Sequence, residues 1–279
     1  MEVVKKNIGI LVFLIAISTQ FAYSQKGMEA GLWLGGAHYF GDLNNLYRIN
    51  EPGLAGGATV RYNFNHRLSV RGQLNLARIR AHDTKSTNAF DLRRNLNFYS
   101  NIIEFAPAME INFFHYKHGS KEKGVSPYLY GGYSFFYFNP KTKYNGETIE
   151  LRPLGTEGQH VGQEYYSIAG AWLVGGGVKF DLNYRWSINV DLGYRFTSTD
   201  YLDDVHSIYP DYSELRSSRG DMAVLLADRS LPDSNNSKIG IEGTQRGDSR
   251  DKDAYITAGV NLIYFFGRLN CPPLSIPRE

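Results

Sequence analysis

The chain has 279 residues and a formal net charge of +2, so it lacks the basic field that nucleic-acid binding requires. Its mean hydropathy of −0.36 argues against a bundle of membrane-spanning helices. The 20 tyrosines and 29 glycines are typical of a β-protein with tight turns and aromatic side chains at an interface.

The N-terminus has the pattern of a secretory signal peptide. Lys5 and Lys6 supply a positive segment, residues 8–17 are apolar, and residues 22–24 form a small-x-small cleavage site. We therefore expect residues 1–24 to be removed on export. A helical membrane anchor is the alternative, but the apolar run falls short of the roughly 18 residues that a span needs.

Alternation of apolar and polar residues with a period of two dominates the remaining chain. It is clearest in residues 185–196, where apolar side chains from Trp186 to Phe196 share one face of an extended strand. Strands in globular proteins usually have about five or six residues, whereas a tilted strand crossing a bilayer needs about 9–11. About eight such strands are predicted, at residues 28–40, 54–64, 68–80, 102–114, 127–138, 171–180, 185–196 and 255–266.

The connections between these strands alternate in length. Those after the second, fourth and sixth strands are short, whereas the others are long, up to residues 197–254. Outer-membrane barrels have short periplasmic turns at one end and long extracellular loops at the other. The sequence therefore predicts an all-β, transmembrane, antiparallel up-and-down β-barrel over residues 25–270, closed by its first and eighth strands. A soluble secreted β-protein is the alternative.

One face of the predicted strands carries charged residues. On a lipid-facing surface an Arg or Lys at mid-bilayer costs about 2–4 kcal/mol, so these side chains should point into the lumen and pair there. The interior of an eight-stranded barrel is just wide enough to be filled by side chains, which predicts a closed lumen without an open pore. The predicted lumen charges are Glu29, Arg71, Glu104, Glu110, Lys179, Asp191 and Arg195.

Catalytic and metal-binding patterns are weak in this sequence. His82 beside Asp83, or His206 near Asp203, could imitate a barrel hydrolase, but such pairs arise often by chance in loops. Asp203 and Asp204 could supply oxygen ligands to calcium, yet their spacing does not match an EF-hand loop, and a capped turn or short helix is the preferred interpretation. We expect no catalytic site, no metal and no cofactor.

The last nine residues, 271–279, form a predicted periplasmic tail. It begins with Cys271, the only cysteine, so an internal disulfide is impossible. Two prolines follow and end the last strand. The thiol could pair with a partner protein, or it could simply be idle.

Eight stretches carry a family resemblance: residues 33–43, 60–64, 126–132, 136–140, 153–159, 193–195, 199–205 and 227–230. Together they are similar to the PorG-like family of Bacteroidota outer-membrane β-barrels. The resemblance implies a component of the type IX secretion system, which associates with a periplasmic ring containing a lipoprotein. It also implies export of cargo with C-terminal sorting domains, support of gliding in some bacteria, and no enzymatic residues.

A non-enzymatic barrel of this kind would contact its ring through the short turns and the tail. Two alternatives stay open: an adhesin or ligand-binding barrel acting through residues 197–254, and a hydrolase using His82, His160 or His206. We expect outer-membrane lipid around the barrel, and neither nucleic acid nor a small-molecule substrate. The candidate partner-binding residues are His115, Tyr116, Lys117, His118, Lys121, Lys123 and Cys271.

Overall fold

The computed structural model describes residues 27–45, 48–116, 118, 124–248 and 252–267. The predicted signal peptide at residues 1–24 and the predicted tail at residues 271–279 lie outside this part of the chain. Within it, no helix is long and apolar enough to span a membrane.

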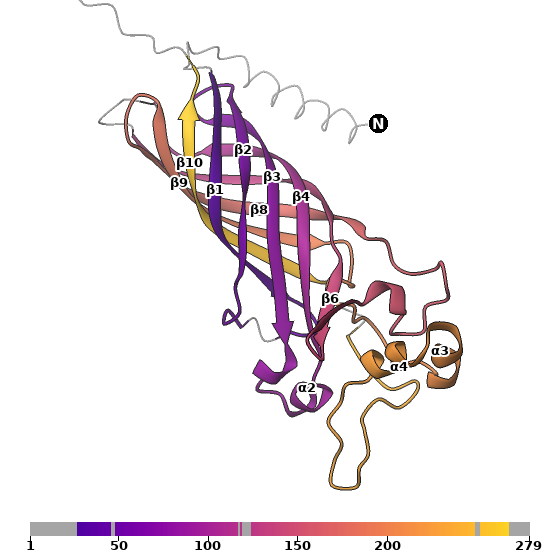
Figure 1. The fold of residues 1–279 in the computed structure, drawn as a ribbon. Coiled ribbons are helices and arrows are strands. Elements are labelled where there is room, and N and C mark those ends of the chain that lie inside the picture. The colour runs from indigo at the N-terminus through magenta and orange to yellow at the C-terminus, as the bar shows by residue number, and fades with distance from the viewer. Residues whose placement is uncertain (1–26, 46–47, 117, 119–123, 249–251, 268–279) are drawn as a thin grey trace, which may run out of the picture.

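Eight antiparallel strands close into a barrel (Figure 1). The first and last strands pair from Glu29 opposite Phe265 to Phe40 opposite Ala254, and the third strand pairs with the fourth to complete the ring. The predicted fold and its closure by the first and eighth wall strands are therefore confirmed. The wall strands are β1 (Gly27–Phe40), β2 (Gly53–Asn63), β3 (Leu68–His82), β4 (Asn97–Asn112), β5 (Val125–Tyr137), β8 (Ile168–Asp181), β9 (Trp186–Thr197) and β10 (Ala254–Phe265).

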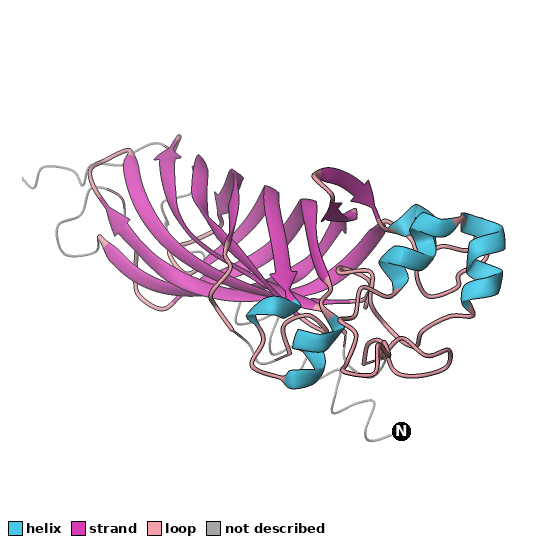
Figure 2. Cartoon of the chain, turned by 60° about the horizontal axis from the view of Figure 1, so that its bottom comes forward, coloured by secondary structure: helices cyan, strands magenta, loops and turns pink. Residues whose placement is uncertain are grey.

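The two ends of the barrel differ, as the loop lengths predict. We call one end of the barrel the turn end. It carries the short connections between β2 and β3, β4 and β5, and β8 and β9, together with the N-terminal end of β1 and the C-terminal end of β10. The opposite end carries the long connections and, within the described residues, the helices (Figure 2). We call the described residues within 41–52, 83–96, 138–167 and 198–253 the cap.

The long connections contain structure that the alternation pattern could not predict. β3 and β4 extend as a hairpin past the wall, so β4 begins five positions before the predicted residue 102, and Tyr99 of β4 pairs with Lys141 of a short extra strand. The further elements of the cap are η1 (Asp83–Lys85), α2 (Ala89–Arg94), β6 (Pro140–Tyr144), β7 (Glu147–Glu150), η2 (Arg152–Leu154), α3 (Tyr212–Arg219) and α4 (Asp221–Ala227).

A hydrophobic core joins the cap to the mouth of the barrel. Tyr39 and Phe136 from the wall pack in the same cluster as Leu96 from the connection between β3 and β4, and Leu202 and Leu226 from the connection between β9 and β10. All five side chains are buried. The cap is therefore a folded lid, and its hydrophobic core is continuous with that of the barrel mouth.

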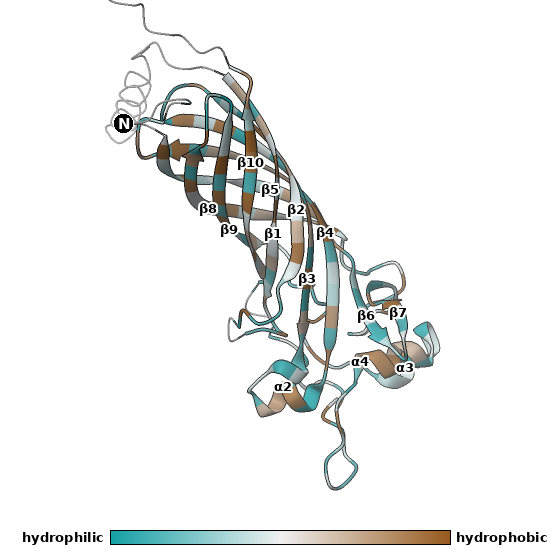
Figure 3. Cartoon of the chain, turned by 60° about the vertical axis from the view of Figure 1, so that its left-hand side comes forward, coloured by the Kyte–Doolittle hydropathy of each residue, from teal (hydrophilic) through white to brown (hydrophobic). Residues whose placement is uncertain are grey.

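The outer surface of the wall is apolar, and polar residues alternate with apolar ones along each strand (Figure 3). Leu32, Leu74 and Leu192 are each more than half exposed, as lipid-facing side chains would be in the absence of lipid. Aromatic side chains border this belt at both ends, which is the pattern of a barrel that meets two membrane interfaces. They include Tyr133, Phe135, Tyr137, Trp172 and Phe196 toward the cap, and Phe64, Phe113, Phe180, Trp186 and Phe266 at the turn end.

Candidate functional site

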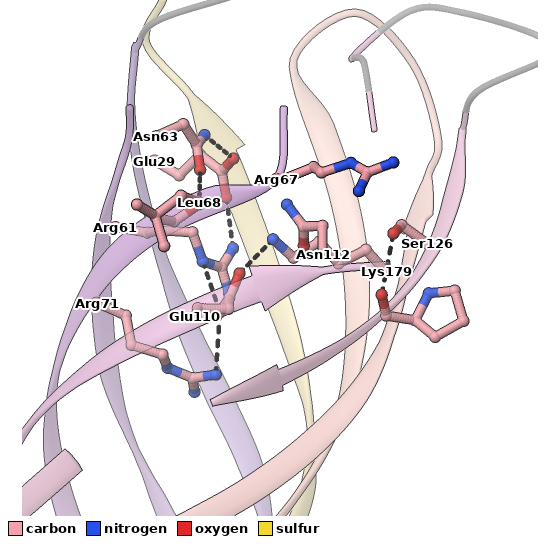
Figure 4. Close-up of polar contacts among 12 residues, drawn as sticks. Glu29, Arg61, Asn63, Arg67, Leu68, Arg71, Glu110, Asn112, Ser126 and Lys179 are labelled. Carbon is pink, nitrogen blue, oxygen red and sulfur yellow. Dashed lines mark hydrogen bonds and ion pairs between the residues drawn. The ribbon is translucent and has the colours of Figure 1, made fainter. Parts of the chain in front are cut away.

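Glu110 of β4 lies at the centre of a buried ionic network in the turn-end half of the lumen (Figure 4). Its Oε2 lies 3.0 Å from Arg61 and 3.3 Å from Arg71, while its other carboxylate oxygen accepts from Lys179. These residues lie on different strands at positions that alternate with lipid-facing residues, so the period-two pattern of the sequence aims all of them inward.

Two further carboxylates extend the network beyond Glu110 and balance its positive charges. Arg61 also contacts Glu29 at 2.5 Å, and Arg71 contacts Asp191 at 2.7 Å. Three cations thus face three carboxylates. Desolvating a charge costs several kcal/mol, and only well-placed opposite charges and hydrogen bonds offset that cost.

Two tyrosines of β5 fill the lumen beside the cations. The Arg71 guanidinium lies 4.1 Å from the centre of the Tyr130 ring, and the Lys179 ammonium lies 5.0 Å from that of Tyr128. The glycines opposite make room, because a Cβ at Gly175 would come within 2.3 Å of the Tyr130 ring. The glycine run of β8 therefore makes room for the large side chains of its neighbouring strand β5 inside the narrow lumen.

A second polar layer lies closer to the cap. Arg195 pairs with Glu104 at 3.1 Å, Asn75 donates to Glu104 at 2.7 Å, and Trp33 Nε1 donates to Asn75 at 2.8 Å. Asp191 and Arg195, four residues apart on β9, thus pair across the lumen and not with each other. All seven predicted lumen charges are buried inside the barrel, and Arg61 of β2, which was not among the predicted charges, belongs to the same network.

The cap is held over the lumen by buried ion pairs of its own. Arg94 binds both carboxylate oxygens of Asp83, at 2.8 and 2.9 Å. Arg246 pairs with Glu157 at 3.0 Å and donates to the backbone carbonyl of Asp204 at 2.6 Å. The Arg246–Glu157 pair joins two different connections, and Arg94 also donates to the backbone carbonyl of Arg246 at 2.8 Å, so three of the loops are fixed to one another.

Tyr39 joins the mouth of the barrel to the cap through two carboxyl groups. Its hydroxyl oxygen lies 2.6 Å from Asp203 Oδ2 and 2.7 Å from Asp253 Oδ1. One hydroxyl proton can serve only one of these contacts, so the other needs a protonated carboxyl group as donor. Burial, together with the repulsion between the neighbouring carboxylates, raises the pKa of both Asp203 and Asp253 well above the usual range, which favours a proton on this pair.

The histidine–carboxylate pairs considered for a hydrolase do not form. His82 lies 2.8 Å from Glu51 instead, while Asp83 is bound to Arg94. His206 lies 2.5 Å from Asp200, whereas Asp203 faces Tyr39.

The third histidine considered, His160, is exposed and lies 3.9 Å from Glu214.

Among the described residues, no cluster of three or more His, Cys, Asp and Glu side chains has the geometry of a metal site. Asp204 accepts instead from Thr156 and Tyr165. Asp203 accepts from the backbone amide of Val205 as a capped turn does.

Tyr116 and His118, two described residues of the connection between β4 and β5, are buried at the turn end of the lumen. His118 is buried, with one ring nitrogen 2.9 Å from Asp181 and the other 3.2 Å from Glu29. Tyr116 is also buried, whereas His115 is exposed. Tyr116 and His118 therefore anchor the turn. Lys117, Lys121, Lys123 and Cys271 lie outside the described residues, and their partner-binding role stays a prediction.

His118 carries a shifted pKa for an identifiable reason. Burial opposes its protonation, but the hydrogen bonds to Asp181 and Glu29 outweigh burial and raise its pKa above 6.5. No periodic signal marks this residue, because its position depends on how a turn packs.

The central role of Glu110 can be tested with Glu110→Gln. The substitution leaves three buried cations facing two carboxylates, so we expect a loss of about 3–5 kcal/mol in the free energy of unfolding. Urea titration of the protein refolded in lipid vesicles measures it. The control Lys141→Gln breaks an exposed pair of 2.7 Å with Glu150 and should change stability by less than about 1 kcal/mol. Equal losses would contradict a special role for the lumen network.

His118 should make stability depend on pH. Since its folded pKa is raised, protonation stabilises the fold fully below about pH 6.5, and this contribution is lost as the pH rises through the folded pKa. In His118→Gln the difference in unfolding free energy between pH 5.5 and pH 9 should shrink. The control His115→Gln, on the exposed part of the same turn, should keep the difference. An unchanged difference in His118→Gln would refute the assignment.

Solved structures with a similar fold include small barrels of low sequence identity. The attachment invasion locus protein Ail of Yersinia pestis is 11% identical, and its alignment covers 87% of this chain and 99% of the Ail chain with a TM-score of 0.40. The N-terminal barrel domain of OprF from Pseudomonas aeruginosa is 10% identical, with coverages of 87% and 100% and a TM-score of 0.38. The outer membrane protein OprG of the same species is 9% identical, with coverages of 87% and 96% and a TM-score of 0.38.

The sequence itself matches no curated protein significantly. A family model described as a domain of unknown function, DUF6089, matches residues 5–223, which is most of the chain. The protein belongs to the DUF6089 family.

Proposed function

We propose that this protein is a non-enzymatic outer-membrane barrel of the type IX protein secretion system, where it associates with the periplasmic lipoprotein-containing ring. The observation that carries the proposal is the filled and capped lumen within a wall whose outer face suits lipid. Such a barrel offers no path for cargo. Its two ends are what remain available to partners, so its role is to hold other components at the membrane. The resemblance to the PorG-like family supports this particular machine.

The dimensions of the wall support placement in a bilayer. Its strands have 11 to 16 residues. At about 3.3 Å per residue and a tilt of about 45°, the shortest spans roughly 25 Å, close to the apolar band of outer-membrane barrels. An even number of strands puts both ends of the barrel chain on the same side, which in outer-membrane barrels is the side of the short periplasmic turns. The turn end therefore faces the periplasm and the cap faces outward.

The turn between β4 and β5 is the proposed contact for the ring. Tyr116 and His118 fix its base inside the lumen, so the turn is presented from a rigid support. His115 is exposed on it, and Lys117, Lys121 and Lys123 add positive charge. A cationic turn of this kind suits an acidic surface on the periplasmic partner.

A sealed lumen makes a direct prediction about conductance. The purified protein in a planar lipid bilayer should leave ion conductance at the baseline, because buried side chains and the folded cap close the barrel. Arg61→Ser combined with Arg71→Ser removes two of the largest buried lumen side chains and should raise conductance. Discrete open-channel currents from the unmodified protein would overturn the sealed barrel.

Secretion is the decisive test of the proposed function. Deleting the gene should abolish export of cargo with C-terminal sorting domains, and the full chain should restore it. Replacing Lys117, Lys121 and Lys123 by Gln should weaken co-purification of the ring proteins and reduce export. The matched control replaces Lys85, Lys141 and Lys143 of the cap by Gln and should leave both unchanged. Normal export in the deletion strain would refute the proposal.

A second candidate function is an adhesin or ligand-binding surface, which the folded cap favours. Its ion pairs and core give the outward end a defined shape, as a binding surface requires. In that case, replacing the exposed residues 232–237 by a glycine–serine linker would abolish surface binding while secretion continued. Loss of secretion without any binding phenotype would favour the first function.

A further inference from the structure

A groove of about 560 Å³ runs along the outer wall of the barrel near the cap. It crosses β1 to β4, and its exposed apolar sides include Leu34, Leu54, Leu76 and Ile103. Gly56 explains its depth, because this residue pairs with Leu34 on one side and Leu76 on the other but has no side chain to fill the space between them. The groove is thus a hollow in the surface that faces lipid.

The outward-facing positions of β3 change from apolar to cationic at the edge of this groove. Leu74 and Leu76 are followed by Arg78 and Arg80, all four exposed. Successive positions on one face of a strand are about 6–7 Å apart, so the two arginines extend the groove toward the cap. Arg78 itself lines the groove.

Both guanidinium groups are held in place but are not neutralised. Arg78 Nε donates to Asn101 at 2.8 Å, and its guanidinium lies 5.0 Å from the Tyr99 ring centre. Arg80 donates to the backbone carbonyl of Pro52 at 3.0 Å. Among the ion pairs of the described residues, none joins either arginine to a carboxylate. Each guanidinium has five N–H groups, so most of them can bind an anion.

The carboxylate beside Pro52 does not neutralise them either. Glu51 is engaged by His82 at 2.8 Å. The rim therefore presents two positive charges directly above an apolar hollow. Arginine binds phosphate oxygens in pairs of parallel hydrogen bonds, which makes this combination suited to a molecule with both a phosphate and a hydrocarbon chain.

We propose that the groove and the Arg78–Arg80 pair bind a phosphorylated glycolipid of the outer leaflet, of the lipid A class. An acyl chain occupies the groove between Leu34, Leu54 and Leu76, and a phosphate group lies on the two guanidinium groups. The inference rests on the proposed function in one respect, because the outward orientation of the cap places these arginines in the outer leaflet. Charge complementarity and continuity with the lipid-facing wall select this occupant.

Binding of lipid A to the full-length protein in detergent, measured by native mass spectrometry, tests the phosphate contact. Arg78→Gln with Arg80→Gln should weaken binding by on the order of tenfold, the effect of losing charge-assisted hydrogen bonds. The matched control is Arg185→Gln at the turn end, since Arg185 is exposed and, like Arg78, lies over a tyrosine ring, 5.7 Å from the Tyr264 ring centre.

Three further results separate the possible sources of the anion. Dephosphorylated lipid A should bind the unmodified protein as weakly as lipid A binds the double variant. Inorganic phosphate in millimolar excess should not displace lipid A. Undiminished binding by the double variant would overturn the proposal, and full displacement by phosphate would indicate a site for free anions instead.

The groove is tested separately with Leu54→Trp, which fills it from an exposed, lipid-facing position. Val190→Trp on β9 is the matched control. Heat-dependent gel mobility verifies that both variants are folded. We expect weaker lipid A binding only for Leu54→Trp, and equal binding by both variants would refute the acyl-chain site.

Flotation with vesicles and fractionation of outer membranes distinguish this inference from the proposed function. Correct membrane location and normal secretion without lipid A binding would overturn only the lipid site. Absence from the outer membrane would overturn both, because the arginines would then not face a lipid leaflet.

Discussion

The charge balance around Glu110 is the constraint on which the rest of the structure depends. The network links Glu29 of β1, Arg61 of β2, Arg71 of β3, Glu110 of β4, Lys179 of β8 and Asp191 of β9. Tyr130 of β5 stacks on Arg71, and Asn261 of β10 donates to Asp191 at 3.1 Å, so every wall strand takes part. A shift of one strand by one residue would turn its charge toward lipid, which means that the network also specifies strand register.

The strands and their faces could be predicted because they depend on local alternation. Asp191 and Arg195 were placed in the lumen correctly from parity alone, and Arg61 has the same signal on β2. The cap could not be predicted, since its contacts join distant residues, such as Arg94 and the carbonyl of Arg246, 152 positions apart. His118 was missed as a lumen residue for a similar reason, because a turn has no periodicity to show which side chain folds inward.

The two ends of the barrel divide the available surface between different kinds of contact. At the turn end, buried Tyr116 and His118 fix a short turn that carries the predicted contacts with the ring. At the other end, the ion pairs of Arg94 and Arg246 make a lid out of long loops. Between the two ends, the lipid-facing positions of β3 are apolar until Arg78 and Arg80, which lie next to the cap.

The pairing of β1 with β10 has a consequence for how the protein is made. Trp33 and Asn261 are neighbours across this seam although 228 residues separate them, so the ring closes only after nearly the whole chain is present. Asp253 immediately precedes β10 and contacts Tyr39 of β1, so this contact between cap and wall depends on the pairing of the two strands. This contact of the lid and the closure of the wall therefore depend on the same strand pairing. Without that pairing, β1 and β10 would each leave a row of unpaired backbone N–H and C=O groups at an open edge.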